Sequence, residues 1–386
     1  MKLFAVVVFG FAALAVAHPG HEEPQHELLY KRHFNSQMRR GLKACAGEFE
    51  RRGINTRAHA RRQAVVESYR KTLKSKVSIR DTDTVANTSH LSTESYNLDT
   101  PETTIFNSSN TCILNPEGET GPYYVPGELI RSNLTESQPG VPIVLEAQFV
   151  DVTTCAPIEG LWWDLWNCNS TGVYSGVVAN GNGDTSDLSN INKTFLRGIQ
   201  PSDADGVVTF DTIFPGHYSG RATHHHMVVH MNSSVLANGT LTGGTVAHIG
   251  QAFWDQDLIY KVEATYPYNT SNITITENVD DRVFITETED TDSDPVFEYV
   301  YLGDDLSDGL FGWITIAINT SATYDPNYSF VLTADGGVEE SGGTTTVDGE
   351  GSGNGTGNFT DFPSGSMTGA VPTASLAERF FQVDWR

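Results

Sequence analysis

The sequence predicts an all-β protein: a β-sandwich core with a helical, basic N-terminal segment and a disordered, acidic tail rich in Gly, Ser and Thr. Three observations support this prediction. Short apolar alternations separated by Gly, Pro, Asn and Asp recur over residues 105–335, as expected for many short strands. The segment before them is rich in Ala, Arg, Lys and Glu, which favour helices. The segment after them has too few apolar residues to bury a core.

The chain begins with one Lys, a short apolar run and the small residues Ala15-Val16-Ala17, which predict a secretory signal peptide over residues 1–17. No later apolar stretch is long enough to span a membrane. Acceptor sequences for N-glycosylation are frequent. They lie at Asn87, Asn107, Asn133, Asn169, Asn192, Asn232, Asn238, Asn269, Asn272, Asn319, Asn327, Asn354 and Asn358. We therefore expect a secreted, extracellular glycoprotein.

Residues 18–104 form the basic segment, with one or two helices expected between about 35 and 76. Residues 18–80 carry 15 Lys and Arg against 6 Asp and Glu, a net charge of +9, whereas residues 81–386 carry 8 against 42, a net charge of −34. The segment is either a propeptide cut at dibasic pairs or a basic helix docked on the acidic body. The pairs are Lys31-Arg32, Arg39-Arg40, Arg51-Arg52 and Arg61-Arg62. The acidic body argues against nucleic acid or a membrane as partner.

Residues 105–335 are long enough to form one β domain with a substantial core, and the strand pattern alone fits a barrel as well as a sandwich. The clearest alternations predict strands at 143–150, 161–167, 206–214, 282–289 and 312–319. Residues 336–386 then form a low-complexity tail.

An even number of cysteines in an oxidising compartment favours two disulfides among Cys45, Cys112, Cys155 and Cys168. If Cys155 sits in a turn and Cys168 ends the next strand, about 25 Å or more of extended chain separates them, too far for a disulfide. We favour the pairs Cys112–Cys168 and Cys45–Cys155.

Three consecutive histidines interrupt an apolar run at 220–230, which we interpret as a strand. Because side chains alternate along a strand, His224 and His226 share one face, about 6.6 Å apart, and His225 points to the other. His230 lies about 13 Å beyond His226, too far to bind the same ion. A metal held by these two imidazoles needs further ligands. Tyr174 and Tyr218 are candidates because each lies in a Gly-rich turn, where the backbone can approach a metal closely.

Taken together, these stretches resemble the intradiol ring-cleavage dioxygenases, non-haem Fe(III) enzymes that cleave catechols between the two hydroxyls. The secretion features suggest the fungal-type branch of that family. The resemblance covers about residues 110–262, from the Gly-Pro-Tyr-Tyr stretch in 117–131 to 250–257. The matching elements are Trp166, Gly172-Val173-Tyr174-Ser175, Arg197-Gly198, Ser202-Asp203, Gly206, Thr212-Ile213, Pro215-Gly216-His217-Tyr218, Arg221, His224, His226, Gln251 and Phe253. One departure is His225, where the family usually has Ile.

The resemblance implies a ligand set for Fe(III) and a cis,cis-muconate-type product from a small aromatic diol and O2. The implied ligands are Tyr174, Tyr218, His224 and His226. The resemblance further implies that Tyr218 acts as general base after leaving the metal and that Arg221 stabilises negative charge on the ring. Tyr123 and Tyr124 are expected either to line the ring pocket or to pack the edge of the sandwich. Gln200 either reaches the substrate or completes a turn. Family members often dimerise, so a homodimer is compatible with the sequence.

A non-enzymatic alternative is a secreted metal-binding β-sandwich that serves as a cell-wall or surface binding module. Such a module would need the ligands but not Arg221. The presence of this arginine beside a complete ligand set favours the enzyme.

Overall fold

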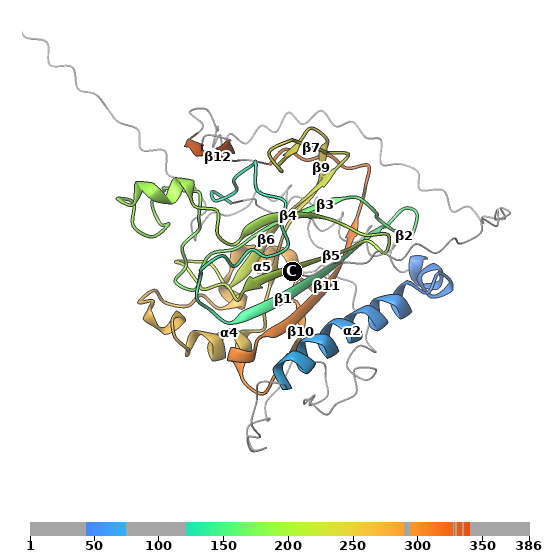
Figure 1. The fold of residues 1–386 in the computed structure, drawn as a ribbon, viewed down its shortest axis with the longest axis horizontal. Coiled ribbons are helices and arrows are strands. Elements are labelled where there is room, and N and C mark those ends of the chain that lie inside the picture. The colour runs from blue at the N-terminus through green and yellow to red at the C-terminus, as the bar shows by residue number, and fades with distance from the viewer. Residues whose placement is uncertain are drawn as a thin grey trace, which may run out of the picture. The chain divides into compact units, whose positions relative to one another are not determined.

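A computed structural model describes residues 44–74, 121–288, 294–326, 328, 330–333 and 336–339 (Figure 1). Predictions about residues 1–17, Cys112 and residues 340–386 lie outside these ranges. The described chain consists mostly of strands in sheets, with a few helices, which confirms the β-rich prediction. No helix within it is long and apolar enough to cross a membrane.

Two sheets form the framework. The larger has the order β10-β11-β1-β2, with β5 also paired to β1, and β1 and β11 are its parallel pair. Its strands are β1 (Pro142–Asp151), β2 (Ala156–Pro157), β5 (Val207–Ile213), β10 (Glu298–Tyr301) and β11 (Leu310–Ile318). The smaller is antiparallel and comprises, in spatial order, β4 (Arg197–Pro201), β3 (Trp162–Trp166), β6 (His224–Met231) and β9 (Thr245–Phe253).

Two further pairs are β7 (Ser234–Val235) with β8 (Leu241–Thr242), and β12 (Phe330–Thr333) with β13 (Gly336–Glu339). The sequence assigned residues 336–339 to the tail, but they pair as β13. The helices are α2 (Ile54–Lys74), α4 (Gln256–Glu263) and α5 (Arg282–Thr288), and residues 44–51 are also helical. Short 3-10 turns are η1 (Leu188–Asn192), η2 (Tyr268–Thr270), η3 (Asn278–Asp280) and η4 (Leu306–Asp308).

The main hydrophobic core takes side chains from both sheets. Trp163 of β3 is fully buried, and its ring meets Phe149 of β1 at 5.7 Å and Phe210 of β5 at 5.2 Å, both edge-on. Edge-to-face contacts of this kind add to the stabilisation from buried area. The alternation of β1 therefore places one set of residues in this core and the other on the opposite face of the sheet.

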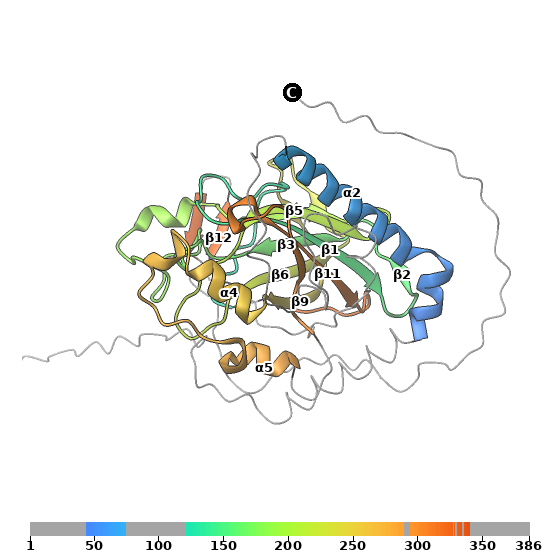
Figure 2. The ribbon, with the colours of Figure 1, turned by 90° about the horizontal axis from the view of Figure 1, so that it is seen from below.

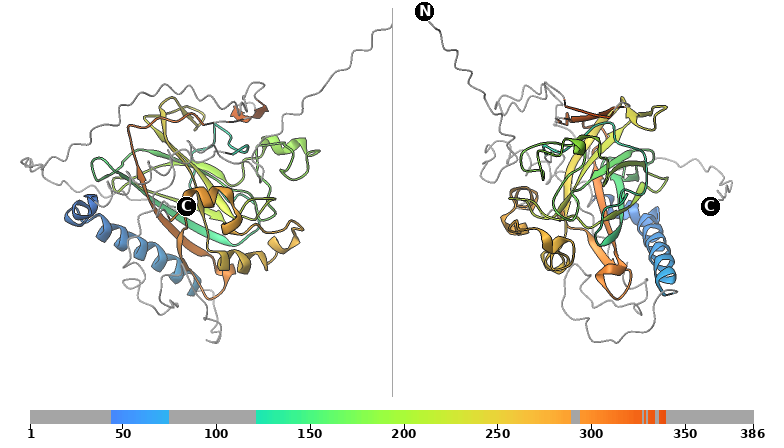
Figure 3. Two further views of the ribbon diagram at one scale, coloured as in Figure 1. Left: turned by 180° about the vertical axis from the view of Figure 1, so that it is seen from behind. Right: turned by 60° about the vertical axis from the view of Figure 1, so that its left-hand side comes forward.

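Helix α2 covers that opposite face (Figure 2). Val66 of the helix packs with Val144 of β1 and with Phe311 and Trp313 of β11. This contact explains why β1 is buried on both faces. Seen from another side, α2 lies across the larger sheet from α4 and α5 (Figure 3).

Charge complementarity fixes the helix on the sheet. The carboxylate of Glu146, on β1, is fully buried and accepts hydrogen bonds from Arg62 Nε at 2.7 Å and from Arg61 Nε and Nη2 at 3.1 Å. Arg57 Nε donates to Asp205 at 2.7 Å. Of the two alternatives for the basic segment, a helix docked on the acidic body is what the structure shows for α2.

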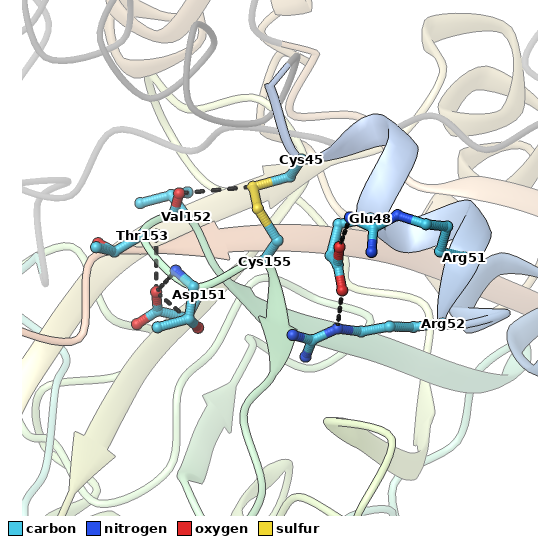
Figure 4. Close-up of a disulfide and its surroundings, with 9 residues drawn as sticks. Cys45, Glu48, Arg51, Arg52, Asp151, Val152, Thr153 and Cys155 are labelled. Carbon is cyan, nitrogen blue, oxygen red and sulfur yellow. Dashed lines mark hydrogen bonds and ion pairs between the residues drawn. A yellow bond between two sulfur atoms is a disulfide. The ribbon is translucent and has the colours of Figure 1, made fainter. Parts of the chain in front are cut away.

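The disulfide prediction is half right. Cys45 is bonded to Cys155, with Cα atoms 5.2 Å apart, and joins the helical residues 44–51 to the turn after β1 (Figure 4). The predicted Cys112–Cys168 pair is not observed: Cys112 lies outside the described residues, and Cys168 is a buried free thiol that donates to the Gly216 carbonyl oxygen at 3.3 Å. Burial raises the pKa of this thiol well above its usual value. The Cys168 side chain packs as a small apolar residue in the same cluster of buried side chains as Tyr174 and Tyr218.

Four of the five predicted strands are observed as β1, β3, β5 and β11. The fifth, 282–289, is wrong: residues 282–288 form helix α5. Asp281 explains the difference, because its carboxylate accepts hydrogen bonds from the backbone N–H groups of Val283 at 2.8 Å and Phe284 at 3.0 Å. These are donors that a helix start leaves without an intrahelical partner.

The substitution His225→Ile is expected to stabilise the protein by about 1–2 kcal/mol, because it removes a buried polar ring without a partner. His225 points into the core between Trp254 and Phe297, and neither of its ring nitrogens has a hydrogen-bond partner among the residues that the structure describes. Urea unfolding of the two proteins under identical conditions measures the difference. His225→Ala serves as control and should destabilise by leaving a cavity. If the Ile variant were less stable than the wild type, the buried His225 ring would not be a destabilising group.

Candidate active site

Four side chains converge at one end of the smaller sheet. His224 and His226 lie on the same face of β6, with their Nε2 atoms 2.9 Å apart. The Tyr174 hydroxyl oxygen is 3.1 Å from His226 Nε2 and 3.5 Å from His224 Nε2. The Tyr218 hydroxyl oxygen is 3.2 Å from His224 Nε2. The predicted ligand residues thus present two nitrogen and two oxygen atoms to one point.

Glycine allows the two tyrosine loops to meet. Gly172 has a φ of +83°, and a Cβ atom there would lie 2.2 Å from the carbonyl oxygen of His217. Only a residue without a side chain fits this contact, which packs the loop before Tyr174 against the loop before Tyr218. The Gly-x-Tyr spacing in the sequence therefore has a direct structural cause.

Hydrogen bonding and stacking orient the imidazoles. His224 Nδ1 donates to the Ala222 carbonyl oxygen at 2.6 Å, which directs an unprotonated Nε2 toward the cluster. The His226 ring stacks on the Trp166 indole, with centroids 4.9 Å apart and an interplanar angle of 3°. The backbone at Gly121 passes close to the edge of the His226 ring, because a Cβ atom at Gly121 would lie 3.2 Å from His226 Cε1.

Burial keeps all four groups uncharged in the metal-free chain. It raises the pKa of Tyr174 and Tyr218 well above the usual value for a phenol. It also lowers the pKa of His224 to about 3, assisted by the charge of Arg221, and lowers that of His226 well below 6.5. A highly charged cation would reverse the phenol equilibrium by replacing the two protons.

The structure places the predicted substrate-binding residues Tyr123, Tyr124 and Gln200 in three different environments. Tyr123 is at the cluster: its ring stacks on Tyr174 at 4.7 Å and meets Tyr218 edge-on at 5.9 Å. Tyr124 directs its hydroxyl group to Asp164 Oδ2 at 3.3 Å. Gln200 is not brought to the cluster, because its amide donates to the Thr209 carbonyl oxygen at 3.0 Å.

Arg221 reaches the cluster from the loop before β6. Its Nη1 lies 3.5 Å from the Tyr218 hydroxyl oxygen, and its Nη2 donates to Gln251 Oε1. Burial alone would lower the pKa of Arg221. The interactions with Tyr218 and Asp281 raise this pKa by more, so it lies above its usual value and the guanidinium stays charged.

Sequence reasoning gave no role to two residues that shape this site. Arg197 is fully buried and donates to the carbonyl oxygens of Tyr123 and Ser175 at 2.6 and 2.7 Å. It thereby ties together the loops that carry Tyr123 and Tyr174. Its Arg-Gly motif was visible in the sequence without indicating this function. The other residue, Asp281, had no signal, because its partner Arg221 lies 60 positions earlier.

A family model described as "Dioxygenase" matches residues 120–234, which carry all four clustered side chains. Fold and site thus define a dioxygenase. An intradiol ring-cleavage dioxygenase from Tetranychus urticae is 31% identical, with 56% of this chain and 98% of that chain covered and a TM-score of 0.46. The chain belongs to the intradiol ring-cleavage dioxygenases, a family of oxidoreductases that act on catechol-type substrates.

A second similar structure is the dioxygenase domain of a dioxygenase carbohydrate-binding protein fusion from the cellulolytic bacterium Streptomyces sp. SirexAA-E. It is 23% identical, with 54% of this chain and 97% of that chain covered and a TM-score of 0.33. No curated protein matches the sequence.

Proposed function

We propose that this protein is a secreted non-haem Fe(III) intradiol dioxygenase that cleaves a catechol-type ring between its hydroxyls with O2 and yields a cis,cis-muconate-type product. The observation that carries the proposal is the convergence of two phenol oxygens and two imidazole nitrogens, each of which lies 2.9–3.5 Å from at least one of the others. Such a mixed oxygen and nitrogen set suits a ferric ion.

Tyr174, Tyr218, His224 and His226 would hold the metal. Bound Fe(III) supplies Lewis acidity, and two phenolates offset most of its charge. Among the described residues, no group of three or more His, Cys, Asp and Glu is placed to hold a metal, so the tyrosines are essential to this donor set.

Each remaining residue has a task that its position supports. Tyr218, as a phenolate, accepts a proton from a substrate hydroxyl at its own oxygen. Arg221 Nη1 faces that same oxygen and stabilises negative charge that develops on the substrate. Tyr123 presents an aromatic face beside the cluster, which orients a planar ring by stacking.

Secretion and the domain layout belong to the same proposal. The Cys45–Cys155 disulfide suits an oxidising compartment, and acceptor residues such as Asn133, Asn192 and Asn269 are exposed. The catalytic unit is a β-sandwich over 105–335, supported by a core shared between the two sheets. Helix α2 remains part of this unit as the cover of the larger sheet.

The visible spectrum of the iron-loaded protein tests the proposal. Tyrosinate bound to Fe(III) gives a charge-transfer band, which should shift when catechol is added and weaken in Tyr218→Phe. The matched control is Tyr260→Phe, an exposed tyrosine that donates to Glu277, and it should leave the band unchanged. With isotopically labelled O2, both atoms should enter the product. A protein that stays colourless after iron loading contradicts the proposal and favours a non-catalytic binding module.

A further inference from the structure

The three nitrogen atoms of the Arg221 guanidinium face three different residues. Nε donates to Asp281 Oδ2 at 2.8 Å, Nη2 donates to Gln251, and Nη1 is directed to the Tyr218 hydroxyl oxygen at 3.5 Å. The first two contacts are to the protein framework. They leave the Nη1 edge as the part of the group that faces the cluster.

Asp281 is the anionic partner among these contacts. Its side chain is fully buried, and it also accepts from the backbone N–H of Ala222 at 2.7 Å. The same carboxylate holds the first N–H groups of α5, at Val283 and Phe284. Burial would raise the pKa of Asp281, but the charge of Arg221 and these hydrogen bonds keep it below its usual value, so the group is a carboxylate.

A buried guanidinium needs both a counter-charge and a fixed direction. Gln251 can supply direction but no charge, whereas Asp281 supplies both and is itself held by three backbone groups. Holding an arginine side chain in one orientation costs considerable rotamer entropy. The carboxylate provides the interaction that offsets this cost.

We propose that Asp281 is a positioning residue that fixes the Arg221 guanidinium so that its Nη1 edge faces the Tyr218 oxygen and the oxygen atoms of the substrate. This inference rests on the proposed function. It means that the segment between β9 and β10, which contributes no predicted ligand, contributes to the reaction through one carboxylate.

Asp281→Asn is the sharpest test, because Asn caps a helix about as well as Asp but carries no charge. For catechol, kcat is expected to fall about 10- to 100-fold, while KM, iron content and the tyrosinate band change little. In an Arg221→Gln background, Asp281→Asn should cause no further loss of kcat, because the two residues act as one unit. Wild-type kcat in Asp281→Asn, or effects that multiply in the double variant, would overturn the inference.

A second readout does not depend on iron or on activity. In the metal-free protein, the Arg221 Nε–H should give a resolved, slowly exchanging NMR signal, assigned by its loss in Arg221→Gln. Asp281→Asn should remove or broaden that signal. Its persistence would refute positioning by Asp281, whereas a colourless, inactive wild-type protein would refute the proposed function. The matched control is Asp305→Asn, which alters the capping box of η4 and should leave kcat and this signal unchanged.

Discussion

His226→Ala is expected to abolish stable iron binding and to lower ring cleavage by more than about 100-fold, a larger loss than substitution of an outer partner of a ligand produces. The variant removes the nitrogen that lies 2.9 Å from His224 Nε2 and 3.1 Å from the Tyr174 oxygen. It also removes the ring that stacks on Trp166. Iron content by metal analysis, the tyrosinate band and catechol turnover measure the three consequences.

His230→Ala is the matched control, because it changes the same residue type on the same strand. His230 interacts with Asp164 at 3.3 Å, at the part of β6 beyond the cluster. This variant should retain iron and its colour. Equal iron content in the two variants would show that the ligand set is wrong.

Glu146→Leu is expected to cost about 3–5 kcal/mol of unfolding free energy, because it leaves the buried charge of Arg62 without its partner. The Arg62 side chain is 4% exposed, and Glu146 is fully buried. The Arg62 guanidinium also lies 5.7 Å from the Trp313 ring centroid. This aromatic contact helps to bury the group, but its charge must still be balanced by a carboxylate. Urea unfolding measures the loss, and hydrogen exchange of α2 should rise with it.

The double variant Glu146→Leu/Arg62→Leu should recover much of this stability, because paired apolar residues can replace a buried ion pair. Asp187→Asn breaks the exposed Lys193–Asp187 pair and should leave stability almost unchanged. If Glu146→Leu were as harmless as Asp187→Asn, helix α2 would not depend on this pair.

The alternation of side chains was enough to predict which histidines share a face, because strand geometry is local. His224 and His226 meet the tyrosines, and His225 points into the core. The Gly-rich turns were expected to bring the backbone close to a metal, and at Gly172 the close approach is to the backbone of His217. These features depend on residues near one another in the sequence.

Features that depend on distant partners could not be predicted in this way. Residues 282–288 alternate like a strand, but one hydrogen-bonding carboxylate at 281 starts a helix. Cys168 could be counted toward a disulfide, but only packing shows that its thiol is enclosed in the core. Gln200 and Arg197 are three positions apart on β4, yet only Arg197 reaches the tyrosine loops.

The disulfide also changes what an intact molecule means for this protein. Cys45 and Cys155 are 110 positions apart, and the exposed Arg51, with 75% of its side chain accessible, lies between them. Hydrolysis of one peptide bond within that interval would give two polypeptides that still migrate together until a reductant is added. The covalent unity of the enzyme therefore depends on the redox state of its surroundings as well as on an unbroken main chain.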